Sequence, residues 1–292
     1  MSIIQEELND LFDKADKADE LTEDVYHYTK SESLMPILTS RKLFMSDYKD
    51  ILSEFEHPLQ CLKKLIPEIN LPTPIHCEAG RLTKFWETLD WYLRDKIRCF
   101  RLSFCLKRDD SNMWNTFGEN GKGYAIRISK DYFKLSASPL TLNPDSKTSP
   151  TLVRTRIAYE DGKEKGYLTK LANLINKHLD NLSPKNQKDI LAELYPSIIS
   201  WIPKFLTAET NLHNEHEYRC YTFYDHLSAP PNIIKLNNTE GIYTGEIPFA
   251  HIVEILVGPN TNFIVYALTR EILNLQNTAE IFILLKILGY RR

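Results

Sequence analysis

Strand-like segments near both ends of the chain enclose a helical middle, and this order constrains the fold more than any other feature. β-branched and aromatic residues are frequent in short runs at 25–29, 43–45, 98–106, 123–128, 152–159, 217–223, 241–247, 252–257 and 281–287. The apolar spacing at 165–179 and 188–207 is instead typical of helices. Repeated βαβ units would alternate strands and helices, so we expect one α+β domain over 1–292 with a helical insertion at 160–210.

Three local patterns refine this expectation. Apolar residues recur at helical spacing over residues 3–20, which predicts an amphipathic N-terminal helix that could pack on a second subunit. Turn-forming residues separate segment 98–106 from segment 123–128, so we expect these two strands to form a hairpin. Three prolines predict a loop: Pro67, Pro72 and Pro74.

Composition and missing motifs exclude several classes of protein. Lys+Arg 36 against Asp+Glu 39 gives a net charge of -3, which argues against a polybasic nucleic-acid binder. The chain has only 10 glycines, and it contains no G-x-G-x-x-G, Walker, G-x-S-x-G or H-E-x-x-H motif. Rossmann dehydrogenases, P-loop enzymes, α/β-hydrolases and zincins are therefore disfavoured.

The sequence also predicts a cytoplasmic protein without a membrane segment. The first residues are acidic and lack an apolar signal core. No window approaches the roughly 18 apolar residues that a membrane helix needs. The 5 cysteines are scattered, without a C-x-x-C pair, and are interpreted as reduced thiols. No metal site is expected.

The first segment whose side chains could bind a ligand or take part in catalysis is the strand over 25–29. Side chains alternate faces along a strand, so His27 and Thr29 share one face, and Tyr26 and Tyr28 share the other. A histidine and a hydroxyl on one face can bind the sugar hydroxyls of a ligand. The alternative is a buried histidine whose hydrogen bonds go to the backbone.

The second segment begins the strand over 217–223. Glu215, Glu217 and Arg219 fall on one face of an extended chain. Such a face can place a carboxylate against the positive charge that develops when a glycosidic bond breaks. The alternative is a solvated strand with cross-strand ion pairs, which stabilise little.

The third segment is rich in aromatic residues and glycines. Its aromatic residues, Trp114 and Tyr124 among them, could stack on a planar ring such as nicotinamide or a base. The alternative is core packing, with Trp114 the exception because it lies among polar turn residues. Gly118, Gly121 and Gly123 cluster in one turn beside Trp114, so this turn is a candidate for ligand contact.

Taken in order, these segments resemble a bacterial family called domain of unknown function 2971. The resemblance rests on short motifs spread over most of the chain: Tyr26-His27-Tyr28-Thr29, Ser103-Phe104-Cys105, Met113-Trp114, Gly121 to Ile128, Glu215-x-Glu217-x-Arg219 and Ile255 to Pro259. Ser46-Asp47 and Glu54-Phe55-Glu56 only approximate a further family motif after the second strand. The family name carries no activity.

A weaker resemblance is to the ADP-ribosyltransferase fold, especially toxin-type enzymes that modify DNA or RNA. It implies a split, mixed or antiparallel sheet with NAD in its cleft as the substrate. His27 and Thr29 would then hold NAD, and Trp114 or Tyr124 would stack on nicotinamide. Glu217 would be the catalytic acid, assisted by Glu215. The acceptor would be a macromolecule, protein or nucleic acid, and the role that of a toxin or phage-defence effector.

Two other classes of function remain open. One is a non-catalytic sensing or protein-interaction module of a bacterial defence system. The other is a nucleic-acid-cleaving enzyme in which Asp47, Glu215 and Glu217 hold a metal ion. The placement of His27 relative to Glu217 separates these readings, because a transferase of this type requires both residues to line one cleft.

Overall fold

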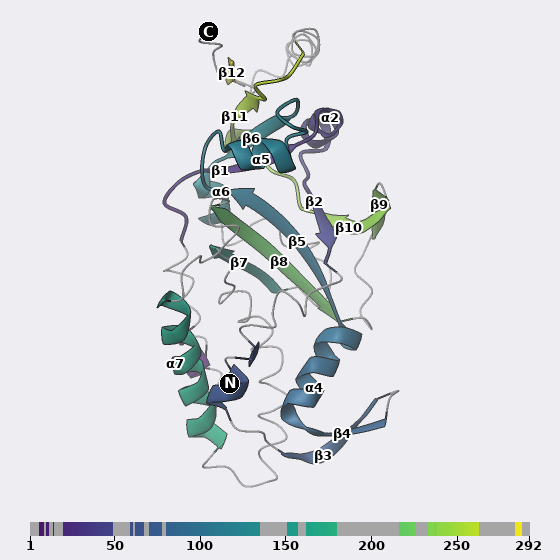
Figure 1. The fold of residues 1–292 in the computed structure, drawn as a ribbon, viewed down its shortest axis with the longest axis vertical. Coiled ribbons are helices and arrows are strands. Elements are labelled where there is room, and N and C mark those ends of the chain that lie inside the picture. Colours follow the sequence, from purple (N-terminus) through teal and green to yellow (C-terminus); the bar gives the residue numbers. More distant parts are fainter. Residues whose placement is uncertain are drawn as a thin grey trace.

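The structure is a computed structural model that describes a ten-stranded β-sheet, a two-stranded sheet and several helices (Figure 1). The described residues are 6–8, 10, 11, 14, 20–48, 59, 60, 62–66, 70–77, 80–134, 151–156, 162–179, 216–225, 233–236, 238–262 and 284–287. The expected helix over 188–207 lies outside this set, as do Glu215 and residues 54–56.

The expected α+β class is confirmed, with a curled, largely antiparallel sheet as its centre. Eight of its ten strands follow the order β12-β11-β6-β1-β5-β2-β10-β9, and β8 and β7 extend it from β5. The strands are β1 Val25–Thr29, β2 Phe44–Asp47, β5 Ile97–Cys105, β6 Tyr124–Ile128, β7 Thr151–Arg156, β8 Glu217–Asp225, β9 Ile234–Leu236, β10 Thr239–Tyr243, β11 Ile252–Val257 and β12 Leu284–Ile287. Only β11 and β12 are described as a parallel pair.

The sheet divides at β5, its longest strand together with β8. One edge of β5 pairs with β8 over the whole length of both strands. The other edge pairs with β1 at Cys105 and with β2 at Phe100 and Arg101. The expected hairpin of β5 with β6 is therefore wrong, because β1 lies between them and pairs with both. The turn residues predicted that segments 98–106 and 123–128 are neighbours in the sheet, whereas β1 lies between them.

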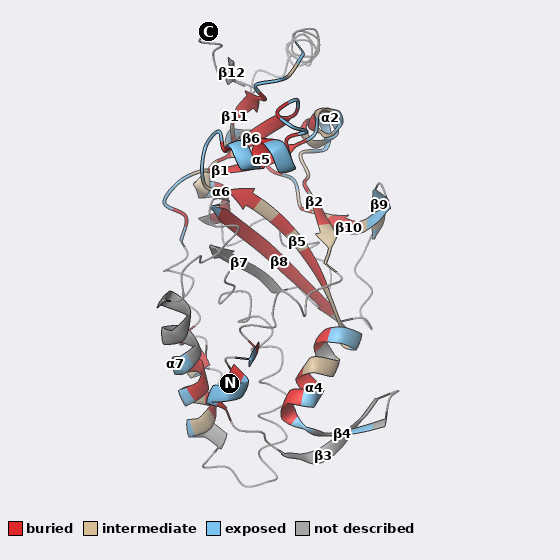
Figure 2. Cartoon of the chain, viewed as in Figure 1, coloured by how far each residue is buried: buried red, intermediate tan, exposed pale blue. Residues whose placement is uncertain are grey.

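Both faces of the sheet are buried around β1, β5 and β6 (Figure 2). The core of one face, here called the main core, contains Val25, Leu34, Leu38, Phe104, Tyr124, Ile126, Tyr132, Phe133, Tyr218 and Ile255 among others. The core of the other face, here called the small core, consists of Tyr26, Tyr28, Cys105, Met113, Trp114, Ala125 and Leu256. Successive residues of β1 thus alternate between the two cores, as strand geometry requires.

Short helices cover these faces. α2 (Ser31–Ser40) contributes Leu34 and Leu38 to the main core, and α6 (Lys130–Lys134) contributes Tyr132 and Phe133. α5 (Ser111–Thr116) covers the small core, and Asp110 caps it by accepting hydrogen bonds from the amides of Asn112 and Met113. The side-chain oxygen of a capping aspartate satisfies amides that the first turn leaves unpaired.

The short 3-10 helix η4 (Phe249–His251) directly precedes β11. Two further helical segments lie toward the other end of the molecule from α5, β1 and β6 (Figure 1). They are α4 (Phe85–Trp91), continued by the π-helical turn η1 (Tyr92–Lys96), and α7 (Gly162–Leu179). α7 lies within the expected insertion. The described residues near the N-terminus are helical. Leu8 and Leu11 of this segment are already buried within the single chain, without a second subunit.

A separate two-stranded sheet corrects the proline prediction. β3 (Asn70–Cys77) contains Pro72 and Pro74 and pairs with β4 (Gly80–Lys84), with an irregular register between Asn70 and Ile75. A two-stranded sheet consists of edge strands, and an edge strand tolerates residues that cannot donate a backbone hydrogen bond.

Candidate functional site

A row of polar side chains crosses five strands on the face of the small core. The strand register places Glu254 of β11 opposite Arg127 of β6, and Arg127 opposite Tyr26 of β1. It continues with Cys105 of β5 opposite Tyr26, and Glu217 of β8 opposite Cys105. Directly opposite residues of antiparallel strands share a face. Glu217 and Glu254 therefore mark the two ends of one continuous row.

Glu217 forms a buried ion pair within its own strand. Arg219 Nε donates to Glu217 Oε2 at 2.9 Å, and Arg219 Nη2 donates to the same oxygen. Arg219 Nη1 donates to Tyr221 Oη at 3.4 Å. Glu217 is 3% exposed and Arg219 9%, so the alternative of a solvated strand is wrong. Glu217 and Arg219 do share a face, as predicted.

Cys105 lies between Tyr26 and Glu217 but is a poor nucleophile. Burial raises the pKa of the Cys105 thiol to about 12, and the negative charges of Asp110 and Glu217 add to this effect. The backbone amide of Lys107 donates to its Sγ at 3.3 Å. Because the thiolate is the reactive form, Cys105 fills the small core as a thiol.

His27 lies on the opposite face from Glu217. Tyr26 and Tyr28, its neighbours in β1, belong to the small core with Cys105. The His27 ring instead contacts Phe104 of the main core edge to face, with ring centroids 5.9 Å apart. The structure therefore does not bring His27 and Glu217 to one face of the sheet.

His27 is half-buried on the face of the main core. Burial lowers the pKa of His27 to about 4, although a hydrogen bond to the backbone of Ser103 partly opposes the shift. Its Nδ1 is buried without a hydrogen-bond partner.

Thr29, Tyr124 and Trp114 are also packed inside the protein. Thr29 is opposite Tyr124, on the face of His27, and both are buried. Trp114 lies on the other face, edge to face with Tyr28 at 4.8 Å between centroids. Trp114 Nε1 donates to Asp109 Oδ1 at 2.7 Å, which fixes the indole. The core-packing alternative thus describes both aromatic residues, Trp114 included.

The glycine turn serves close backbone packing. A Cβ on Gly123 would lie 2.2 Å from the carbonyl oxygen of Thr29, and one on Gly258 would lie 2.3 Å from that of Gly121. The amide of Gly258 donates to the carbonyl of Gly123 at 2.9 Å. These glycines let the turn close on the ends of β1 and β11.

The charged end of the row was missed by sequence reasoning. Glu254 Oε1 accepts from Arg108 at 2.9 Å, and its Oε2 lies 3.6 Å from Arg127, which also pairs with Asp24 at 2.7 Å. A register shift between Ile252 and Glu254 places the acid opposite Arg127. The available signal was an acid within the apolar run 252–257.

The metal site proposed for a nucleic-acid-cleaving enzyme does not form among the described residues. Asp47 pairs with Arg98 at 2.6 Å near one end of β5, whereas Glu217 lies opposite Cys105 at the other end. The part of the chain that the structure describes holds no group of three or more His, Cys, Asp or Glu side chains suited to a metal ion.

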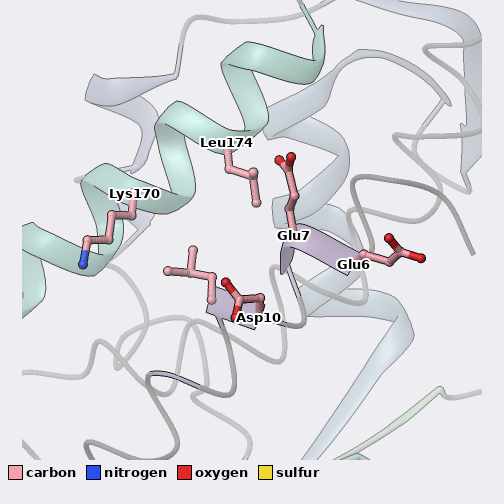
Figure 3. Close-up of a pocket in the computed structure, with 6 residues that line it drawn as sticks. Glu6, Glu7, Asp10, Lys170 and Leu174 are labelled. Atoms are coloured by element: carbon pink, nitrogen blue, oxygen red, sulfur yellow. The ribbon is translucent and has the colours of Figure 1, made fainter.

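A cavity of about 450 Å³ lies away from this row, between α7 and the helical residues near the N-terminus (Figure 3). Its lining residues are Glu6, Glu7, Asp10, Leu11, Lys170 and Leu174. Lys177 of α7 bridges to Glu7 at 2.8 Å and joins the two elements beside it. None of the predicted site residues lines this cavity.

Comparisons with protein-family models, with curated proteins and with solved structures give no match. No helix among the described residues has the length and apolar character needed to cross a membrane. The polar row and the Glu217–Arg219 pair within it are thus the features on which a proposal about function can rest.

Proposed function

We propose that the chain is an NAD-consuming enzyme in which Glu217 is the catalytic carboxylate and which, unlike enzymes of the ADP-ribosyltransferase type, does not use His27 in the same cleft. The observation that carries this proposal is the Glu217–Arg219 ion pair, buried at the start of a central strand. The proposed reaction breaks the bond between nicotinamide and ribose and transfers ADP-ribose to a macromolecular acceptor or to water.

The chemistry needs a negative group beside the ribose carbon that loses nicotinamide. Positive charge develops at this carbon as the bond breaks, and a fixed carboxylate stabilises it more strongly away from bulk water. Arg219 fixes the orientation of the Glu217 carboxylate from within the same strand. No protein side chain needs to act as a nucleophile, which agrees with the raised pKa of the Cys105 thiol.

The residues that the resemblance assigns to NAD take other roles in this proposal. His27 and Thr29 point away from the face of Glu217, and Tyr124 belongs to the main core. Trp114 is on the face of Glu217 but packs against Tyr28. NAD would therefore contact the Glu217 side of the sheet without these four side chains.

Nicotinamide release from NAD tests the proposal directly. We expect the purified protein to release nicotinamide, with labelled ADP-ribose appearing on a macromolecule when cell extract is added. Glu217→Gln should reduce both signals by a factor of about 100 or more, as the loss of a group that stabilises transition-state charge commonly does. Equal release by wild type and Glu217→Gln would overturn the proposal.

Asp47→Asn is the matched control for this experiment. Asp47 is also a buried carboxylate in an arginine pair, and its side chain is 6% exposed. It lies beside the other end of β5. Loss of one buried carboxylate should affect folding similarly in both variants, whereas only Glu217→Gln should lose turnover.

A non-catalytic binding module is the second candidate. The observation that favours it is that Thr29, Trp114 and Tyr124 are buried and that the His27 ring packs against Phe104. If the chain is such a module, NAD does not raise the melting temperature of wild type or of Glu217→Gln, and nicotinamide is not released. A Glu217-dependent shift in melting temperature together with turnover would exclude it.

A further inference from the structure

The loop over residues 106–110, which joins β5 to α5, covers part of the face on which Glu217 lies. We call this loop the strap. Its three middle residues are exposed to solvent, whereas Glu217 is only 3% exposed. A substrate as large as NAD therefore reaches the Glu217 carboxylate only after a covering segment moves. The contacts of the strap show how such a movement can occur.

Two buried side chains of the small core hold the strap from the side of the sheet. The amide of Lys107 donates to Cys105 Sγ at 3.3 Å. The amide of Asp110 donates to Tyr28 Oη at 2.8 Å, and this hydroxyl lies 3.5 Å from the carbonyl oxygen of Lys107. Because its backbone bonds to Cys105 and Tyr28, the strap separates these side chains from solvent, beside α5.

The strap also connects the two ends of the polar row. The amide of Leu106 donates at 2.8 Å to the carbonyl of His216, the residue directly before Glu217. Two residues further along the strap, Arg108 Nη2 donates to Glu254 Oε1 at 2.9 Å. The strap thus begins beside the start of β8 and is fastened on β11, so that it follows the row from one acid to the other.

The contact between Arg108 and Glu254 is the link of the strap that opens most readily. The Arg108 side chain is 40% exposed, and ion pairs of exposed side chains are weak and are screened by salt. Glu254 also lies 3.6 Å from Arg127, which Asp24 holds in place at 2.7 Å. Release of Arg108 therefore leaves the buried Glu254 carboxylate with a second partner.

Two residues of the strap and its surroundings have a left-handed backbone. Asp109 has φ +57° and His216 has φ +46°, a conformation that residues with a Cβ rarely adopt. Such residues depend on the contacts around them and are common in segments that switch. Asp109 accepts from Trp114 Nε1 at 2.7 Å, and His216 accepts from the amide of Leu106. The closed strap is thus held by its contacts and not by the preference of its own backbone.

We propose that the strap is a lid, that the Arg108–Glu254 ion pair latches it in the closed position, and that its opening admits the substrate to Glu217. This inference rests on the proposed function and names the regulation of that site. Arg108 and Glu254 act through the strap and do not contact the reacting atoms. Because the latch is a partly exposed ion pair, ionic strength sets the fraction of molecules with an open strap.

Three substitutions in the strap separate the latch from a general loss of charge. Arg108→Ala removes the latch and leaves Arg127 beside Glu254. Arg108→Lys keeps a positive charge and should retain part of the latch. Lys107→Ala is the matched control, because Lys107 is also an exposed cation of the strap. Its Nζ lies 3.7 Å from Asp110 Oδ2, within the strap itself, so its loss breaks no side-chain link to the sheet.

The Cys105 thiol measures opening without any assumption about activity. Cys105 is buried under the strap, and burial raises the pKa of its thiol to about 12, so alkylation requires the strap to open. Cys99 and Cys220 are buried in β5 and β8, away from the strap, and are the internal controls. A pulse of iodoacetamide followed by peptide mass spectrometry gives the rate at each of the three cysteines.

We expect Arg108→Ala to accelerate alkylation of Cys105 about fivefold, the upper range for an exposed ion pair. Arg108→Lys should have a smaller effect, and Lys107→Ala should match wild type. Added sodium chloride should accelerate Cys105 alkylation in wild type but not in Arg108→Ala. Equal Cys105 rates in wild type and Arg108→Ala would overturn the inference. Equal acceleration at Cys99 and Cys220 would also overturn it, because the variant would then be unfolding as a whole.

Steady-state kinetics of nicotinamide release then test the link to Glu217. When only the open molecules bind substrate, the apparent affinity is reduced by the open fraction. We expect Arg108→Ala to lower the KM for NAD about fivefold with kcat within twofold, and Lys107→Ala to change neither. A raised KM in Arg108→Ala would make Arg108 a substrate contact and overturn the inference. An unchanged KM together with faster Cys105 alkylation would also overturn it, because opening would then not admit the substrate.

The two proposals fail in different ways. If wild type releases no nicotinamide, the proposed function fails, and Cys105 alkylation still decides whether Arg108 latches the strap. If wild type is active and Arg108→Ala matches it in both alkylation and KM, the function of Glu217 stands and the strap is not a lid.

Discussion

His27 and Glu217 lie on opposite faces of one sheet, with only the strand β5 between them. Neighbouring strands are separated by about 4.8 Å, so their backbones lie about 10 Å apart. A single ligand cannot contact both side chains from one side of the sheet. The two residues are connected through the backbone of β5, because Tyr26, next to His27, pairs with Cys105, and Cys105 is opposite Glu217.

Removal of Arg219 should destabilise the protein strongly. Arg219→Leu leaves the Glu217 carboxylate buried without this partner, and loss of one member of a buried ion pair costs about 3–5 kcal/mol. Urea denaturation measures the change in the free energy of unfolding. Adding Glu217→Gln to Arg219→Leu should recover part of the loss. A double variant less stable than Arg219→Leu would contradict the buried pair.

Acid should unfold the wild type more readily than His27→Gln. The pKa of His27 is lowered by burial from 6.5 to about 4, so the unfolded chain binds this proton at higher pH than the folded one. Its contribution to stability is fully present above pH 6.5 and is lost as the pH falls from 6.5 to about 4. At 1.36 kcal/mol per pKa unit, the loss reaches up to about 3 kcal/mol.

The difference between two variants isolates this effect from the carboxylates that titrate in the same range. Urea denaturation of wild type and His27→Gln at several pH values gives two stability curves. We expect their separation to change between pH 6.5 and 4 and to stay constant above pH 7. A constant separation over the whole range would mean that His27 keeps an ordinary pKa in the folded protein.

The elements of the fold were largely predictable, because alternation and helical spacing are local. The strand at Val25–Thr29 has the predicted bounds, and β11 has the bounds predicted for 252–257. The order of strands was not predictable in the same way. The pairing of β1 between β5 and β6 depends on contacts between residues about 80 to 100 positions apart, which a local pattern does not record.

The site was only partly predictable for a related reason. Alternation placed His27 with Thr29 and Glu217 with Arg219, and both pairings agree with the structure. Which of these pairs faces which core depends on the register between strands, and a shift by one residue exchanges the two faces. The sequence therefore gave no means of deciding whether His27 and Glu217 share a cleft.

Trp114 should behave as a structural residue. It is 3% exposed, packs on Tyr28 and donates to Asp109. Trp114→Ala should cost about 3–5 kcal/mol in the free energy of unfolding, as large-to-small substitutions in cores do. Trp114→Phe should leave the KM for NAD within twofold of wild type. A much higher KM for NAD in a stable Trp114→Phe variant would mean that Trp114 contacts the ligand.

Two glycines of the turn beside Trp114 should differ sharply in their tolerance of side chains. An alanine Cβ at position 123 would lie 2.2 Å from the Thr29 carbonyl oxygen, a backbone atom that cannot move without shifting β1. We expect Gly123→Ala to cost about 3 kcal/mol, at the upper end of overpacking effects. Gly121 has φ +80° and meets mainly side-chain atoms at 3.1 Å.

Asparagine accepts positive φ better than other residues with a Cβ, so Gly121→Asn should cost less than Gly123→Ala. Thermal unfolding of the two variants measures the contrast. Equal melting temperatures would mean that the turn can move away from the end of β1.

Arg108 and Arg127 should be coupled through Glu254. Glu254 is 4% exposed and lies within 3.6 Å of both guanidinium groups, so either arginine still partners the carboxylate when the other is removed. Each single alanine variant should therefore cost about 1 kcal/mol, whereas the double variant leaves Glu254 without both. Its loss should exceed the sum of the single losses by about 1–3 kcal/mol in a urea-denaturation cycle. Additive losses would show that neither arginine compensates for the other, and the charged end of the row would then consist of independent pairs.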